Sequence, residues 1–276
     1  MNSISADKGS ARFGFGRNWK NFLAVLNDDR VRAADESLRS MLGVRTLEGS
    51  GFLDIGSGSG LFSLAALRLG ASRVHSFDYD VDSFECTQQL KDRYFPNRPQ
   101  WTVERGSVLD AAYMQSLGTW DVVYSWGVLH HTGDMYGAFA NTVPAVRDGG
   151  RLIIAIYNDQ GWKSKAWWRI KRAYNSNTAT RLAILGIFLP YSMLGGLVAD
   201  ILHLRNPLAR YSAHVRGMSH VHDWVDWLGG FPFEVASRAA VVDYFQARGF
   251  SLERLLSCEG KHGCNEFLFK KTGRAG

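Results

Sequence analysis

Two spacings of apolar residues alternate along most of this chain of 276 residues. Short, mostly apolar runs predict buried strands at 51–55, 73–78, 101–107, 120–126 and 151–157. Apolar positions spaced by three or four residues predict helices between them, at 61–70, 81–95, 110–117 and 135–146. This repeated alternation predicts an α/β fold with a Rossmann-like, doubly wound sheet of mostly parallel strands.

Both ends of the chain add to this core. The stretch EVASRAAVVDYFQARG (234–249) predicts a helix, and FSLERLLSC (250–258) and NEFLFKK (265–271) predict two strands. The few residues between those strands require an antiparallel pair, so we expect an antiparallel last strand. At the other end, residues 17–42 have helical spacing and predict one helix.

Residues 158–233 interrupt the alternation between the fifth strand and the last helix. This segment holds nine Lys and Arg residues, four Asp residues and five of the nine tryptophans. It therefore carries +5 of the formal net charge of +6. We divide the chain into an N-terminal helical cap (1–45), a first part of the core (46–157), a helical lid insertion (158–233) and a last part of the core (234–276).

Bulk composition excludes several classes of protein. A hydrophobic content of 46%, with 13% aromatic residues, excludes a disordered chain and suffices for a large core. The three cysteines are too few and too scattered for a disulfide framework or a four-cysteine zinc site. The N-terminal sequence lacks the apolar stretch of a secretory signal, so we expect a cytoplasmic protein.

A glycine-rich loop, DIGSGSG, follows the first predicted strand. It places Asp54 at the strand end and glycines at 56, 58 and 60, where a ligand can lie against the backbone. Asp78 ends the second strand, a position from which an acid accepts hydrogen bonds from a ribose. The structural alternative is that the glycines only form a tight turn. With both acids in place, we favour a ligand that contains a ribose.

The loop spacing discriminates among such ligands. The glycines follow G-x-G-x-G, not the G-x-G-x-x-G of dinucleotide-binding folds, and the carboxylate of Asp54 repels a pyrophosphate. S-adenosylmethionine has a ribose, a sulfonium and an ammonium but no phosphate. We therefore expect S-adenosylmethionine as the cofactor. A nicotinamide-dependent dehydrogenase and a non-enzymatic nucleotide-binding module are the alternatives.

Four segments resemble a known enzyme family. FLDIGSGSGLFSLAALRLGASRVHSFDYD looks like the first two motifs of class I S-adenosylmethionine-dependent methyltransferases, and GSVLD, WDVVYSWGVLHH and VRDGGRLIIAIY are similar to its later motifs. The resemblance covers roughly residues 45–157 and 234–272 and is specific for fold and cofactor, not for the acceptor. It implies cofactor-binding roles for Asp54, Gly56, Gly58, Gly60, Asp78, Tyr79, Ser107, Val108 and Ser125. Ser107 departs from the pattern, because many members have an Asp there.

Two adjacent histidines follow the fourth predicted strand. Methyl transfer to a hydroxyl needs a base, and a neutral imidazole has a suitable pKa. HHTGD (130–134) resembles a segment of phenolic O-methyltransferases, HDWSD, whose first His is the base, so the resemblance gives His130 the catalytic role. Ubiquinone-pathway methyltransferases have EH there, which gives His131 a supporting role. The structural alternative is that both cap the strand end.

Further candidates lie at the edge where the strands end. We assign acceptor binding to Trp126, Tyr157, Asn158 and Gln160, with ordinary loop roles as the alternative. HVHDWVDW (220–227) carries His220, His222, Asp223 and Asp226, but the pattern H-x-H-D is weak evidence without a further ligand at a typical spacing, so we predict no metal site. Phe15 and Trp19 are candidates to close over the cofactor, or else simple hydrophobic anchors.

The insertion contains LAILGIFLPYSMLGGLVA (182–199), eighteen residues without a charge. That length suits a transmembrane helix, but Pro190 and the glycines favour two short helices. We expect a folded lid over the acceptor. Peripheral contact of 182–199 with an anionic membrane is the second hypothesis.

These observations predict methyl transfer from S-adenosylmethionine to a small, apolar or aromatic acceptor, at oxygen with a His as base. The alternatives are an N-methyltransferase of a small metabolite and an RNA methyltransferase, for which the net positive charge argues. That charge lies in an apolar, Trp-rich insertion, and the sequence contains no recognisable RNA-binding module. We therefore expect a small-molecule partner and no nucleic acid.

Overall fold

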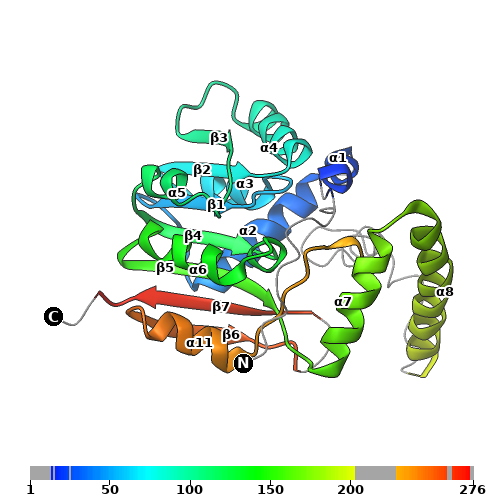
Figure 1. Ribbon diagram of the computed structural model, residues 1–276. Coiled ribbons are helices and arrows are strands. Elements are labelled where there is room, and N and C mark those ends of the chain that lie inside the picture. The colour runs from blue at the N-terminus through cyan, green and yellow to red at the C-terminus, as the bar shows by residue number, and fades with distance from the viewer. Residues whose placement is uncertain (1–13, 15, 25, 203–227, 260–262, 274–276) are drawn as a thin grey trace.

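The computed structural model describes residues 14, 16–24, 26–202, 228–259 and 263–273. A seven-stranded sheet forms its centre, in the order β3-β2-β1-β4-β5-β7-β6 (Figure 1). The strands are β1 (Gly51–Ile55), β2 (Arg73–Asp78), β3 (Trp101–Arg105), β4 (Trp120–Trp126), β5 (Val146–Tyr157), β6 (Phe250–Leu256) and β7 (Cys264–Lys271). β7 runs antiparallel to both of its neighbours, β5 and β6, whereas the pairs among β1 to β5 are all parallel. The predicted Rossmann-like sheet with an antiparallel last strand is confirmed.

Both faces of the sheet are covered, which explains why its strands are apolar almost throughout. Successive side chains of a strand point to opposite faces. Phe52 accordingly packs in the core with Leu64 and Leu90, while Leu53 packs on the other face with Phe139 and Phe245. A strand buried on both sides needs apolar residues at every position.

The helices divide between these two faces. One face is covered by α2 (Asp28–Leu42), α3 (Leu61–Arg68) and α4 (Val81–Tyr94). The other is covered by α5 (Ala111–Ser116), α6 (Met135–Ala145) and α11 (Arg238–Gln246). A short 3-10 turn, η1 (Leu129–His131), follows β4. The result is a three-layer molecule in which the connecting loops meet at the carboxyl ends of the parallel strands.

Several element boundaries differ from the sequence predictions. The single helix expected over 17–42 is two helices, α1 (Gly16–Ala24) and α2, because Asn27 caps α2 by accepting a hydrogen bond from the Arg30 N–H at 3.1 Å. The strand expected from 151 begins earlier, because β5 starts directly after α6 at Val146, which pairs with Trp120. The last helix begins at Arg238 instead of 234, since Ser237 caps it.

The insertion starts with α7 (Trp162–Tyr174) and α8 (Thr178–Leu202). The prediction of two short helices around Pro190 is wrong, because α8 continues through Pro190. Proline leaves the carbonyl four residues earlier without its helical donor. That residue is Gly186, which is exposed, so water can hydrate the freed carbonyl.

The insertion leaves and rejoins the core at one place. Asn158 and Ala236 form an isolated parallel bridge. The Ala236 N–H donates to the Tyr157 carbonyl at 3.1 Å, and the Asp159 N–H donates to the Ala236 carbonyl at 3.1 Å. The two ends of the insertion are therefore tied together by main-chain hydrogen bonds.

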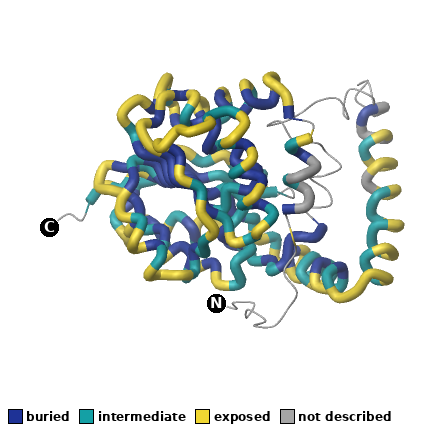
Figure 2. Tube along the Cα trace, turned by 90° about the horizontal axis from the view of Figure 1, so that it is seen from above, coloured by how far each residue is buried: buried dark blue, intermediate teal, exposed yellow. Residues whose placement is uncertain are grey.

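The helix α8 lies at the periphery of the molecule, beyond α7 (Figures 1 and 2). The Phe188 ring contacts the Trp167 ring of α7 edge-on, with centroids 6.1 Å apart. Among the described side chains of α8, most of the other large apolar ones are exposed, with Ile187 at 74% and Tyr191 at 75%. Over Thr178–Leu197 this helix is long and apolar enough to cross a membrane, although one such helix is weak evidence of a span.

Candidate active site

The glycine loop after β1 is a tightly packed turn. Gly56, Gly58 and Gly60 all have positive φ, at 74°, 57° and 76°, which side chains with a Cβ rarely adopt. A Cβ at Gly56 would lie 2.5 Å from the Val128 side chain, and one at Gly58 would lie 2.9 Å from the Trp19 indole. Glycine at these positions lets neighbouring groups approach the backbone directly.

Asp78 at the end of β2 is joined to this loop. Its Oδ2 accepts a hydrogen bond from the Gly58 N–H at 3.0 Å, and its Oδ1 accepts one from the Asp80 N–H at 2.9 Å. Burial raises the pKa of Asp78 to about 6, although both backbone bonds act in the opposite direction. The carboxylate is thus fixed between the loops that follow β1 and β2. The sequence predicts that Asp78 accepts hydrogen bonds from a ribose at this place.

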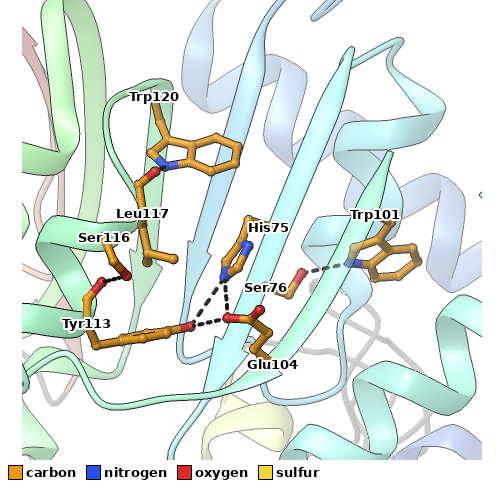
Figure 3. Close-up of polar contacts among 8 residues, drawn as sticks. All are labelled: His75, Ser76, Trp101, Glu104, Tyr113, Ser116, Leu117 and Trp120. Carbon is orange, nitrogen blue, oxygen red and sulfur yellow. Dashed lines mark hydrogen bonds and ion pairs between the residues drawn. The ribbon is translucent and has the colours of Figure 1, made fainter. Parts of the chain in front are cut away.

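Asp54 is buried at the end of β1 and receives a chain of hydrogen bonds. The Ser63 hydroxyl donates to Asp54, and the Ser63 and Ser76 hydroxyl oxygens lie 2.6 Å apart. The Trp101 indole N–H donates to Ser76 at 2.8 Å, a contact drawn in Figure 3. Because an indole only donates and Ser63 already donates to Asp54, the Ser76 hydroxyl must donate to Ser63.

The electrostatics of Asp54 are those of a buried acid beside a second acid. Burial raises its pKa to about 7, the Ser63 hydrogen bond lowers it, and the negative charge of Asp78 raises it further. An acid with this pKa becomes fully ionised at neutral pH when a cation is placed beside it. Sequence reasoning missed Ser63, Ser76 and Trp101, although a serine within the apolar helix LFSLAALR is a weak signal.

The residues predicted to flank an adenine have mixed exposure. Tyr79 is 55% exposed, whereas Val108 is buried and its carbonyl accepts from the Asn141 amide at 2.9 Å. The Ser107 hydroxyl accepts from the Leu109 N–H at 3.2 Å. The Tyr113 ring lies so close to Gly106 that a Cβ there would be 2.3 Å from it.

A cluster of three polar side chains lies next to the residues predicted to flank the adenine. Figure 3 shows His75 of β2, Glu104 of β3 and Tyr113 of α5 pointing toward one another. The Tyr113 hydroxyl donates to Glu104 at 3.1 Å and lies 3.3 Å from His75 Nε2. Burial lowers the pKa of His75, so the imidazole is neutral at pH 7. These contacts fix Tyr113 beneath Gly106, next to Ser107.

The end of β4 is tied to β1 on one side and to β5 on the other. The Ser125 hydroxyl is fully buried and donates to the Ile55 carbonyl at 3.1 Å. The Gly127 N–H donates to the Ala155 carbonyl at 3.2 Å. Trp126 is half-buried and packs against the core. The structure therefore gives Ser125 a clear strand-tying contact, and its cofactor role stays a prediction.

The two histidines differ in their surroundings. The His130 side chain is fully buried, and neither of its ring nitrogens makes a well-formed hydrogen bond with the described residues. His131 is half-buried, and its Nδ1 lies 2.7 Å from the Pro232 carbonyl oxygen. Since a carbonyl only accepts, Nδ1 carries the proton and Nε2 is left as an acceptor.

The ring of Tyr157, at the end of β5, joins the histidines. Its centroid lies 4.1 Å from that of His130 and 5.4 Å from that of His131. Burial, the neighbouring imidazole and Lys171 keep the pKa of His130 well below its usual value. Burial and Lys171 lower the pKa of His131 to about 3. Both imidazoles are therefore neutral at physiological pH.

The turn that carries the histidines is fastened by Glu234, which sequence reasoning missed. Its carboxylate accepts from the Gly133 N–H at 3.0 Å and from the Met135 N–H at 3.1 Å. The Glu234 N–H donates to the His130 carbonyl at 3.0 Å. The isolated acid in FPFEV gave no signal for this role, because its partners lie about 100 residues away in the sequence.

The other predicted acceptor residues lie at the same edge of the sheet. The Asn158 side-chain carbonyl accepts from the buried Asn265 amide at 3.0 Å. The Gln160 N–H donates to the Ser164 hydroxyl at 2.8 Å, at the start of α7. The structure thus brings these residues near the end of β5, together with Tyr157.

Some sequence predictions fall outside the described residues. These are Phe15 and the metal-like pattern of His220, His222 and Asp223, together with Asp226. Among the residues that are described, no group of three His, Cys, Asp or Glu is placed to hold a metal ion. Trp19, which is described, lies against Gly58 at the glycine loop.

Comparisons with known proteins agree with this arrangement. Residues 53–152, from β1 into β5, match a family model described as a methyltransferase domain. The ubiquinone biosynthesis O-methyltransferase of Rhizobium etli is 29% identical over 129 residues, which cover 47% of this chain and 50% of that protein. The tRNA U34 carboxymethyltransferase of Alteromonas mediterranea is 30% identical over 115 residues, covering 40% of this chain and 33% of that protein. This chain thus spans half or less of these relatives.

Solved structures show the same fold. The magnesium protoporphyrin IX methyltransferase of Synechocystis with bound S-adenosylmethionine superposes with a TM-score of 0.51 at 13% identity, covering 87% of this chain and 79% of that chain. At this identity the likeness concerns the fold alone. Together with the matched family model, it confirms the resemblance found in the sequence. Residues 53–152 thus match a methyltransferase domain, and the described residues have the fold of that S-adenosylmethionine-bound methyltransferase.

Proposed function

We propose that this protein transfers a methyl group from S-adenosylmethionine to an oxygen of a small, apolar or aromatic acceptor. The observation that carries this proposal is the pair of acids around the glycine loop. Asp54 and Asp78 stand at the adjacent ends of β1 and β2, and backbone N–H groups hold Asp78. Two carboxylates suit a ligand with a ribose and positive charges, and disfavour a pyrophosphate.

When bound, S-adenosylmethionine supplies an electrophilic methyl group and leaves as a neutral thioether. The protein has to align the acceptor hydroxyl and take its proton. We propose that one of the two histidines of η1 takes the proton of the acceptor hydroxyl. His131 has the geometry of an oriented base, since its Nδ1–H is bonded to the Pro232 carbonyl, and its pKa of about 3 keeps the ring unprotonated but makes it a weaker base than an ordinary imidazole. The sequence resemblance instead favours His130, and both assignments are testable.

Calorimetry tests the cofactor directly. S-adenosylmethionine should bind and NAD⁺ should not. Asp78→Ala should weaken the binding by the value of a hydrogen bond to a charged group, about 1.5–3 kcal/mol. The exposed Asp92, in the last turn of α4, provides a matched control, because Asp92→Ala removes an acid outside the loop contact. Tighter binding of NAD⁺ than of S-adenosylmethionine would overturn the proposal.

The acceptor atom is tested by mass spectrometry of the products. Phenols and quinols should gain a methyl group, whereas amines of similar size and tRNA should not. The net charge of +6 and the relative that acts on tRNA make RNA the control of most interest. Methylation of tRNA with no product from any phenol would replace the proposal by an RNA methyltransferase.

We also propose that the insertion touches an anionic membrane surface. The exposed apolar side chains of α8 suit the acyl boundary, and exposed Trp162 and Tyr191 suit the headgroup level. The preceding helix, α7, has three exposed basic residues that suit acidic headgroups, namely Lys163, Lys165 and Arg169. Such a contact would bring an apolar acceptor from the bilayer to a cytoplasmic enzyme.

A further inference from the structure

A chain of four buried side chains runs from the start of β3 to the end of β1, next to the glycine loop. Its members are Trp101 of β3, Ser76 of β2, Ser63 of α3 and Asp54 of β1, and none of them is more than 2% exposed. Figure 3 shows the link between Trp101 and Ser76. Ser76 is also the register partner of Asp54, so β2 holds it beside the acid. Bulk water is therefore kept away from every link of this chain.

The hydrogen bonds of this chain can run in one direction only. The Trp101 indole N–H donates to Ser76 at 2.8 Å. The Ser76 hydroxyl donates to Ser63, and the Ser63 hydroxyl donates to Asp54. A proton on the Asp54 oxygen that faces Ser63 would make both serines turn round. Ser76 would then direct its proton toward Trp101, but an indole N–H donates and cannot accept. The chain therefore favours the unprotonated form of this oxygen.

Other influences on Asp54 act against its ionisation. Burial raises its pKa to about 7, the Ser63 hydrogen bond lowers it, and the negative charge of Asp78 on β2 raises it. Tyr124, the register partner of Asp54 on β4, is a further titratable residue beside it. Without the Ser63 hydrogen bond, this acid would be protonated over a wider pH range.

We propose that Trp101, Ser76 and Ser63 are positioning residues that keep Asp54 ionised for the cationic part of S-adenosylmethionine. This inference rests on the proposed function, because it gives Asp54 a cationic ligand. The three residues come from three elements, and each acts through the next without touching the cofactor itself. Their loss should therefore change how cofactor affinity depends on pH, which the loss of a residue that serves only in packing would not do.

Calorimetric titration of S-adenosylmethionine into the full-length protein at pH 6 and at pH 8.5 tests the chain. Ser63→Ala removes a hydrogen bond to a charged group, so the pH at which Asp54 ionises should rise by about one unit. More of this acid is then protonated at pH 6, where the affinity should fall by about tenfold, against less than about twofold at pH 8.5. Trp101→Phe should shift the profile less in the same direction, because Ser63 still donates. Ser63→Thr keeps the hydroxyl and should restore the wild-type profile.

Two buried donors outside the chain provide matched controls. The Trp120 indole N–H donates to the Leu117 carbonyl at 3.0 Å (Figure 3), and the Thr142 hydroxyl donates to the Ala138 carbonyl at 2.8 Å. Trp120→Phe and Thr142→Val therefore remove the same kinds of donor without changing a contact of Asp54. Both should leave the pH dependence of cofactor binding unchanged.

A second readout needs no cofactor. Infrared difference spectra of the free protein, with and without Asp54→Asn, show the protonated carboxyl of Asp54. The pH at which this signal disappears should rise by about one unit in Ser63→Ala and by less in Trp101→Phe. An unchanged infrared midpoint, or a loss of affinity that is equal at both pH values, would refute the inference. If S-adenosylmethionine does not bind, the proposed function fails, and the infrared midpoint alone decides whether the chain keeps Asp54 ionised.

Discussion

The carboxylate of Asp54 illustrates how a single side chain is prepared for a cation. Three donors in series, from Trp101 through Ser76 and Ser63, orient their dipoles toward it. Burial and the charge of Asp78 still raise its pKa to about 7. Without a ligand, the buried acid is therefore only partly ionised at neutral pH, and a nearby cation favours its ionised form.

Cofactor affinity should consequently depend on pH. The ionised forms of Asp54 and Asp78 bind a cationic ligand, and their pKa values are about 7 and about 6. Protons must leave these acids below those values, so affinity should rise from pH 5 to pH 7.5 and then level off. Calorimetry in buffers of different ionisation enthalpy should show proton release at pH 6. Asp54→Asn should flatten most of this dependence, whereas an unchanged profile would exclude Asp54 from cofactor binding.

At this scale the sequence predicted the residues that belong to a local pattern. Asp54, the three glycines and Asp78 follow from spacing within one strand–loop–helix unit and the next strand. Ser63, Ser76 and Trp101 come from three elements, and nothing in their sequence positions says that they touch. Lys171 was hidden for a related reason, because it is one of nine basic residues in its segment and only the fold shows that it alone among those described is buried.

Among the elements, the η1 turn carries both histidines that are proposed for proton transfer. It presents two adjacent histidines in different ways, one fully buried and one half-buried with an oriented ring. The turn is fastened to the residues before α11 by Glu234 and Pro232. An anchored base loses little entropy when it meets the acceptor.

Glutamine replacements of the two histidines should separate their roles. His131→Gln should lower kcat by roughly 10²–10⁴ and leave the affinity for S-adenosylmethionine nearly unchanged, because it removes a base but no cofactor contact. His130→Gln should chiefly lower the melting temperature, since it places an amide, which has more hydrogen-bonding groups than an imidazole, in a fully buried position. The reverse pattern would return the base to His130, as the sequence resemblance has it. Steady-state kinetics on an identified acceptor, with thermal melts, provide the readout.

Element boundaries show where local sequence signals compete. Asn27 stops a helical pattern that otherwise runs through it, and its capping hydrogen bond was hidden because the apolar spacing continues on both sides. At Pro190 the signal to stop is not followed, since α8 continues through it and the exposed Gly186 carbonyl, which loses its donor, can be hydrated. The strands were predicted more accurately, because each is an apolar run bounded by turn residues.

The molecule as a whole combines a compact three-layer core with a protruding helix. Its exposed apolar face on α8 is unlike the rest of the described surface, where large exposed apolar side chains are scattered. Exposed apolar area of this kind marks contact with a partner or a membrane. We assign it to an anionic bilayer because exposed basic residues flank it on α7.

Flotation with liposomes tests this assignment. The protein should float with vesicles that contain anionic lipid and should not float with neutral ones, and high salt should release it because surface charges are screened. Ile187→Asp with Leu194→Asp should prevent flotation, and the exposed Ala183→Ser, on the same helix, should have no effect. Binding that persists in high salt would point to insertion of residues 182–199 into the bilayer. No flotation under any condition would leave the lid hypothesis for α8.

The main-chain tie between Asn158 and Ala236 has a consequence for how such an enzyme can diverge. The bridge closes the excursion of the chain at its base, next to the end of β5. The entropic cost of a closed loop changes little with its length, so the segment above the tie can be lengthened or exchanged at small expense to the core. The glycine loop after β1 and Asp78 after β2 lie outside this segment, so exchanging it should leave the predicted donor site unchanged.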